Sequence, residues 1–153
     1  MTSAAILFTF WLSITGLTGH QEPKSILSVA DIDRLINTYK PLMSDLENLG
    51  TKIKNKKDPN LLMGYAASDE AASIFRRHGW DEAFFKKYGV ISQSYVYLQT
   101  EAQVEKMPDQ DRDYMRQSLE PYRAALKKQV HDKDLELVRA HFKRLQDFFD
   151  SLK

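Results

Sequence analysis

Apolar side chains recur every three or four residues through most of this chain, and this spacing restricts the fold to packed helices. The clearest stripe ends the chain and consists of Leu135, Val138, Phe142, Leu145, Phe149 and Leu152. Steps of three and four place such residues on one side of an α-helix. No segment alternates apolar and polar residues at period two, so we predict an all-α fold without a sheet.

Capping residues and prolines divide the chain into five or six amphipathic helices, packed as an irregular bundle. The expected helices cover residues 28–57, 59–67, 68–78, 81–107, 109–126 and 131–153. Ser28 and Asp31 have the spacing of an acidic capping box, and Gly79 is placed as the glycine that ends a helix. Pro41 and Pro121 fall inside apolar stripes, where each either kinks a helix or divides it.

The first twenty residues carry no charged side chain, and the first charge is Glu22. The apolar run Ala4–Leu17 is typical of a secretory signal peptide, with cleavage expected after Thr18 or Gly19. It is shorter than the ~20 residues of a membrane-spanning helix. No basic residue precedes it, so an uncleaved anchor and a buried first helix stay as alternatives. The expected organisation is a signal peptide (1–19), a disordered segment (20–27) and a single helical domain (28–153).

The amino-acid composition limits the cellular locations and the kinds of binding partner that fit this protein. The chain contains no cysteine, and an exported protein without disulfides fits the bacterial periplasm better than the animal extracellular space. We therefore expect a periplasmic or extracellular protein with no stable membrane anchor after signal cleavage. The 22 Lys and Arg residues nearly balance the 21 Asp and Glu residues. A neutral, interspersed surface argues against nucleic acid or an anionic membrane as the main partner.

Motifs for catalysis and for metal binding are missing. The chain has no G-x-S-x-G and no H-E-x-x-H, and its four histidines are not clustered. Asp109, Asp111 and Asp113 mimic the start of an EF-hand loop, but Tyr114 stands where that loop needs glycine. The lysines of 52–57 are interpreted as a solvated helix end. We expect no cofactor, no metal site and no catalytic residue.

The segment 74–98 holds the densest group of aromatic side chains. Such a group forms either the main core at a helical corner or an aromatic-lined groove closed by tyrosine hydroxyls. The candidate ligand- or partner-binding residues on the second interpretation are Trp80, Phe84, Tyr88, Tyr95 and Tyr97.

The same segment carries a resemblance to a known class of proteins. Gly79-Trp80 is followed by Phe85, and the next helix contains Ile91 and Tyr95 in an I-x-x-x-Y pattern. In this respect the chain resembles small exported all-helical proteins of bacteria whose function is unknown. The resemblance implies export and an all-α fold, and it implies no activity.

These sequence features leave three candidate functions. The leading one is an exported, non-enzymatic helical module that binds a protein, a peptide or an apolar ligand. The alternative is a self-associating structural or assembly protein of the periplasm or cell envelope. It would use a spare apolar side, such as the one near Phe148 in the last helix. The third is an enzyme with an unrecognised acid/base pair, whose sign would be a perturbed pKa in a cleft.

Overall fold

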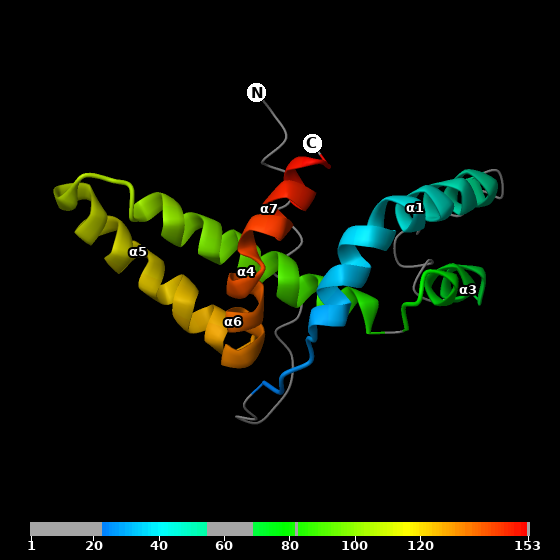
Figure 1. Ribbon diagram of the computed structural model, residues 1–153, viewed down its shortest axis with the longest axis horizontal. Helices are drawn as coiled ribbons and strands as arrows, with labels where there is room; N and C mark the ends of the chain where they lie inside the picture. The colour runs from blue at the N-terminus through cyan, green and yellow to red at the C-terminus, as the bar shows by residue number, and fades with distance from the viewer. Residues whose placement is uncertain (1–22, 55–68, 82, 153) are drawn as a thin grey trace.

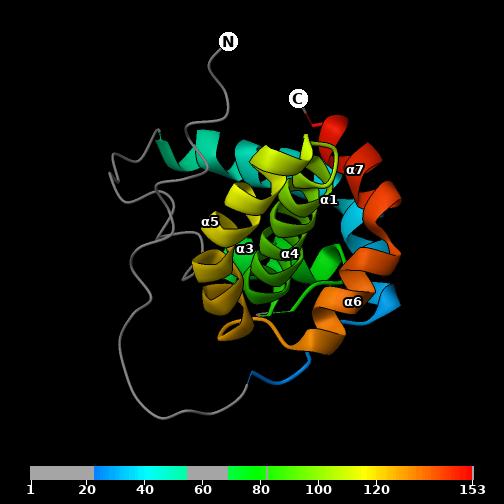
Figure 2. The same cartoon turned by 90° about the vertical axis from the view of Figure 1, so that its left-hand side faces the viewer.

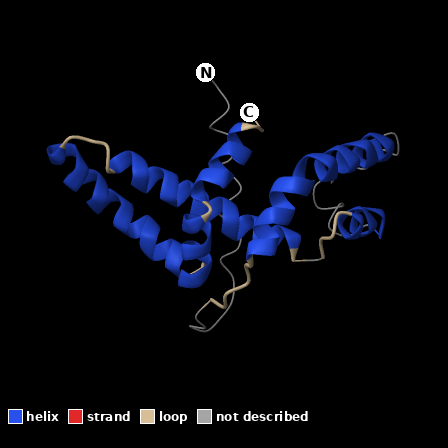
Figure 3. Cartoon of the chain, viewed as in Figure 1, coloured by secondary structure: helices blue, strands red, loops and turns tan. Residues whose placement is uncertain are grey.

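The computed structural model describes residues 23–54, 69–81 and 83–152, and every regular element in them is an α-helix (Figures 1 and 3). The helices are α1 (Val29–Lys54), α3 (Asp69–Arg77), α4 (Phe84–Val104), α5 (Asp109–Lys127), α6 (Asp132–Ala140) and α7 (Phe142–Asp150). The predicted all-α fold is confirmed. The predicted signal peptide and the predicted helix 59–67 lie outside the described residues.

Local sequence signals set the helix ends and the course of α1 and α5. The backbone N–H of Ser28 donates to Oδ2 of Asp31 at 2.9 Å, which is one half of the predicted capping box; the Ser28 hydroxyl donates to the same oxygen at 2.6 Å instead of accepting from the Asp31 N–H. Pro41 and Pro121 lie inside continuous helices, so neither divides its helix. The α1 ribbon changes direction along its length (Figure 1), as expected where a proline removes one backbone hydrogen bond.

Gly79 lies in the turn that follows α3 and leads to α4. Its φ of 76° lies in the left-handed region, which favours glycine because a Cβ is strained there. The N–H of Trp80 donates to the carbonyl of Phe75 at 2.9 Å, and that of Gly79 to Arg76 at 3.0 Å. This glycine-ended turn confirms the prediction at Gly79. It places the Trp80 ring under the guanidinium of Arg34, whose Cζ lies 5.3 Å from the ring centroid.

The C-terminal region corrects the prediction of one continuous helix over 131–153. His141 has φ −110° and ψ 14°, which interrupts the helix between α6 and α7. The change of direction packs two rings of α7 against Tyr95 of α4. The centroid distances are 5.3 Å to Phe142 and 4.6 Å to Phe149. A helical stripe is compatible with such a break, because the apolar spacing continues on both sides of it.

Phe148 is not the spare apolar residue that the sequence suggested. Its side chain is buried, and its ring packs edge-on against Tyr39 of α1 with the centroids 5.5 Å apart. This side of α7 therefore belongs to the core. Self-association, if it occurs, needs another surface.

Helix α4 is the centre of the molecule. It packs against α1, α5, α6 and α7, and most of its apolar side chains are buried. Helix α5 packs mainly on α4, and together they form a hairpin that projects away from α1 and α3 (Figure 1). Viewed along the hairpin, α6 and α7 lie on one side of it (Figure 2).

The segment before α1 is held in place by Asp134 of α6. The Asp134 carboxylate is 1% exposed and accepts hydrogen bonds from Ser25 Oγ at 2.7 Å, Ile26 N at 2.9 Å and Leu27 N at 3.1 Å. Asp134 thus supplies acceptors for the donors of these three residues, while the disorder expected over 20–27 stays a prediction.

Candidate functional site

Three of the five candidate residues form one cluster. The ring of Phe84 lies 4.9 Å from Trp80 and 5.8 Å from Tyr88, measured between centroids. Tyr88 in turn stacks on Tyr39 of α1 at 5.7 Å. Trp80 and Phe84 are each 2% exposed. This cluster joins the start of α4 to α1, and its buried rings contribute to the core.

The other two candidates lie on different sides of α4. Tyr95 is buried against the rings of α7. Tyr97 stacks on Tyr122 of α5 with the centroids 6.3 Å apart, and its hydroxyl donates to Glu101 Oε1 at 2.8 Å. The five residues therefore do not line one common cavity. Whether they bind a ligand stays a prediction, and Tyr97 lines the groove described below.

The tyrosine hydroxyls are held in their neutral form. Burial, together with the neighbouring Tyr39, raises the pKa of Tyr88 above its ordinary value. Burial and the hydrogen bond to Glu101 raise the pKa of Tyr97 to about 12. Both hydroxyls therefore stay protonated near neutral pH, where they can donate hydrogen bonds but are poor general bases.

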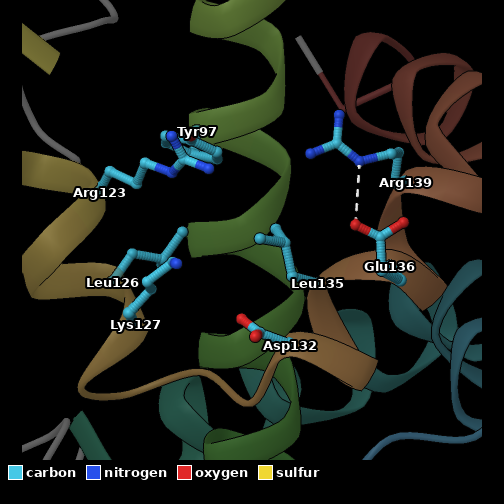
Figure 4. A pocket seen from close by; sticks show the side chains of 8 residues that line it. All are labelled: Tyr97, Arg123, Leu126, Lys127, Asp132, Leu135, Glu136 and Arg139. Carbon is cyan, nitrogen blue, oxygen red and sulfur yellow. Dashed lines mark ion pairs between the residues drawn. The ribbon is translucent and has the colours of Figure 1, made fainter. Parts of the chain in front are cut away.

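The open space beside Tyr97 is a groove of about 320 Å³ between α4, α5 and α6, called here the three-helix groove (Figure 4). Its lining residues are Tyr97, Arg123, Leu126, Lys127, Asp132, Leu135, Glu136 and Arg139. Leu126 and Tyr97 are almost fully buried and Leu135 is half-buried, so they form an apolar floor. The charged side chains stand on the two rims.

The two rims differ in charge. On the α5 rim, Arg123 and Lys127 are both cationic and exposed. On the α6 rim, Asp132 and Glu136 are acidic, and Glu136 pairs with Arg139 at 3.4 Å (Figure 4). The groove thus offers positive charge on one side of an apolar floor and mainly negative charge on the other.

A second, separate hollow also borders Arg139. It has a volume of about 470 Å³ and is lined by Leu98, Glu101, Ala102, Glu105, Arg139 and Phe142. Arg139 borders both spaces and is held by Glu101, with its Nη1 3.1 Å from Oε2.

Sequence reasoning found Tyr97 but missed the rest of the groove. Leu135 belongs to the C-terminal apolar stripe, Leu126 is an inward residue of the preceding helix, and no sequence feature singles out Arg123 or Lys127. The available signal was the short connection between these two stripes, since closely connected helices pack as neighbours. Within the described ranges, no group of three or more histidine, aspartate and glutamate side chains is arranged to hold a metal ion.

A buried ion pair lies outside the groove, between the first turn of α1 and α4. Lys87 Nζ lies 2.8 Å from Asp31 Oδ1, and the Asp31 side chain is 6% exposed. Burial by itself would raise the pKa of Asp31. The hydrogen bonds from Lys87 and Ser28 and the charge of Lys87 outweigh it, so the pKa of this carboxyl is lowered.

This ion pair makes part of the stability depend on acid pH. Because the Asp31 pKa is lower in the folded state, its contribution is present above the unfolded value of 3.8 and is lost as pH falls through the folded value. We expect Asp31→Asn to lower the free energy of unfolding at pH 7 by about 2 kcal/mol. The variant should also lose less stability than the wild type below about pH 4. Urea unfolding followed by circular dichroism at several pH values measures both effects.

Asp113→Asn is the matched control, because the Asp113 side chain is 80% exposed. It should leave stability at pH 7 within about 0.5 kcal/mol of the wild type. An acid profile of Asp31→Asn that parallels the wild-type profile would contradict the role of this pair.

No known protein family, curated protein or solved structure matches this chain. In the part of the chain that the structure describes, no helix is both long enough and apolar enough to cross a membrane.

Proposed function

We propose that this protein is a non-enzymatic binding module that holds a short segment of a partner protein in the three-helix groove. The observation that carries this proposal is the cationic rim of Arg123 and Lys127 beside the apolar floor of Leu126 and Leu135. Ligand sites combine a mostly apolar surface with a few placed polar groups in this way, and the volume of the groove is near their lower end.

The apolar floor and the charged rims of the groove indicate which kind of peptide segment it binds. An apolar side chain on the floor would remove Leu126 and Leu135 from water. A carboxylate next to it would pair with Arg123 or Lys127, and charge-assisted contacts of this kind are among the stronger hydrogen bonds. Because the groove is open and has charged side chains along both rims, we infer that it takes a peptide segment. The expected ligand is an acidic, apolar peptide.

Charge reversal at Lys127 tests this proposal. Peptides selected from a random phage-displayed library on the wild-type protein should pair an aspartate or glutamate with a large apolar residue. Lys127→Glu should weaken the affinity of such a synthetic peptide about tenfold or more in isothermal titration, the effect of losing one charged contact.

Lys128→Glu is the control, because Lys128 is the next residue and exposed, and it does not line the groove. It should leave the affinity within about threefold of the wild type, since a solvent-screened charge contributes little. Selection of no peptide, or an equal loss in both variants, would contradict the proposal.

The location of the module is proposed as exported, periplasmic or extracellular. The support is the uncharged leader at residues 1–20, together with the absence of cysteine from the sequence. The near balance of basic and acidic residues supports a protein partner over nucleic acid. Sequencing the N-terminus of the protein taken from its own cells tests the location. A start at Gly19 or His20 is expected, and an intact Met1 would overturn it.

A further inference from the structure

Three of the five charged side chains that line the three-helix groove already have partners of opposite charge. Arg123 Nη1 lies 3.6 Å from Glu120 Oε1. Arg139 lies 3.4 Å from Glu136 and 3.1 Å from Glu101. These partners reduce the attraction of Arg123, Glu136 and Arg139 for the charges of a bound peptide, because each is already offset by a charge nearby.

The other two charged side chains of the groove are Lys127 on the α5 rim and Asp132 on the α6 rim. Both are exposed, and within the described ranges neither forms an ion pair or a side-chain hydrogen bond. Lys127 is the last residue of α5 and Asp132 is the first residue of α6. Two opposite charges therefore lie at the same end of the groove, on different rims, without contacting each other (Figure 4).

The helix ends explain how these two charges remain in place without partners. Lys127 lies in the last turn of α5 and Asp132 in the first turn of α6, and the helix dipole favours the charge of each. The dipole stabilises the charges but does not occupy their hydrogen-bonding groups. The free protein thus offers one cation and one anion to a segment that enters the groove.

We propose that the peptide segment held in the groove carries both an acidic and a basic group, the acidic one beside Lys127 and the basic one beside Asp132. This inference rests on the peptide-binding function proposed above and adds a second charge to the ligand. A purely acidic peptide would bring its negative charge close to Asp132, and like charges placed together oppose binding. A peptide with both groups forms a charge-assisted contact with each rim.

The size of the groove limits the spacing of the two groups. Its volume of about 320 Å³ is that of a cube with edges of about 7 Å. An extended chain advances about 3.3–3.6 Å per residue, so roughly two residues cross this distance. The acidic and basic residues are therefore expected two or three positions apart, with an apolar residue between them over Leu126 and Leu135.

Peptides selected from a random phage-displayed library on the wild-type protein test the inference. The selected sequences should contain a lysine or arginine two or three positions from an aspartate or glutamate. In isothermal titration with such a synthetic peptide, replacing its basic residue by glutamine should weaken the affinity about fivefold or more, the effect of losing one charged contact.

Asp132→Asn makes the corresponding change in the protein and should weaken the affinity for the selected peptide to a similar extent. The glutamine version of the peptide should bind the wild type and Asp132→Asn about equally, because the contact is absent from both pairs. A purely structural role of Asp132 would weaken both peptides alike. Asp109→Asn is the matched control, since Asp109 is the first residue of α5, is 92% exposed and does not line the groove. It should leave the affinity within about twofold of the wild type.

The possible failures are distinguishable. Selected peptides that lack a basic residue would overturn this inference and leave peptide binding itself intact. So would an Asp132→Asn protein that binds the selected peptide as tightly as the wild type does, or one that loses affinity for the glutamine version equally. Selection of no peptide at all would contradict the proposed function, and this inference with it.

Discussion

Asp134→Ala is expected to lower the free energy of unfolding by about 3 kcal/mol or more, because it leaves two backbone N–H groups without their acceptor. In the native protein the buried carboxylate accepts from Ile26 N, Leu27 N and Ser25 Oγ. These bonds join the segment before α1 to the first turn of α6, over 100 residues away. Chemical denaturation followed by circular dichroism measures the change.

Asp132→Ala is the control that distinguishes the loss of the Asp134 hydrogen bonds from the loss of a negative charge at the start of a helix. Asp132 lies in the same first turn of α6 but is exposed. Its loss should cost only the helix-dipole contribution of about 0.3–1 kcal/mol. Hydrogen exchange adds a local readout, since the amides of Ile26 and Leu27 should exchange faster in Asp134→Ala alone. Equal destabilisation by the two variants would contradict the anchoring role of Asp134.

Trp80→Ala is expected to lower the free energy of unfolding by about 3–5 kcal/mol, the range for removing a large buried aromatic ring. Trp80 is 2% exposed and packs edge-on against Phe84. Its indole N–H donates to Thr38 Oγ1 at 2.9 Å, and Arg34 lies over its ring. The substitution therefore removes contacts between the α3–α4 corner and α1 at once.

Two further variants separate the contributions of the indole hydrogen bond and of ring packing to this loss of stability. Thr38→Val removes the acceptor of the indole N–H and keeps the ring, and should cost about 1 kcal/mol. Trp80→Phe keeps most of the packing and should fall between Thr38→Val and Trp80→Ala. The chain has two tryptophans, Trp11 and Trp80. If the leader is removed, the emission of Trp80 alone reports its burial. A Trp80→Ala protein as stable as Thr38→Val would contradict a packing role.

The candidate site illustrates what helical spacing leaves open. The stripes of Leu126 and Leu135 are visible in the sequence, and each residue is correctly assigned to an inward side. Their meeting around Tyr97 depends on how α5 and α6 lean on α4, which spacing within one helix does not specify. Arg123 and Lys127 look like ordinary surface cations until the neighbouring helix places them on the rim of a groove.

The middle of α4 shows the same limit. Residues 88–100 can be seen to lack charge in the sequence alone. The buried and exposed sides of α4 are separated only once α6 and α7 are placed on one side of it. Phe148 is the opposite case, because it looked available and is covered by Tyr39.

The sequence by itself determined the helical class, the glycine-ended turn at Gly79 and the capping of α1, because these depend on contacts among residues a few positions apart. Only the tertiary structure decided the break at His141, the anchoring of residues 25–27 by Asp134 and the shape of the three-helix groove. Each of these arises where side chains from distant parts of the chain compete for the same buried space or the same hydrogen-bond donor. The spacing of apolar residues within one helix does not predict the outcome of that competition.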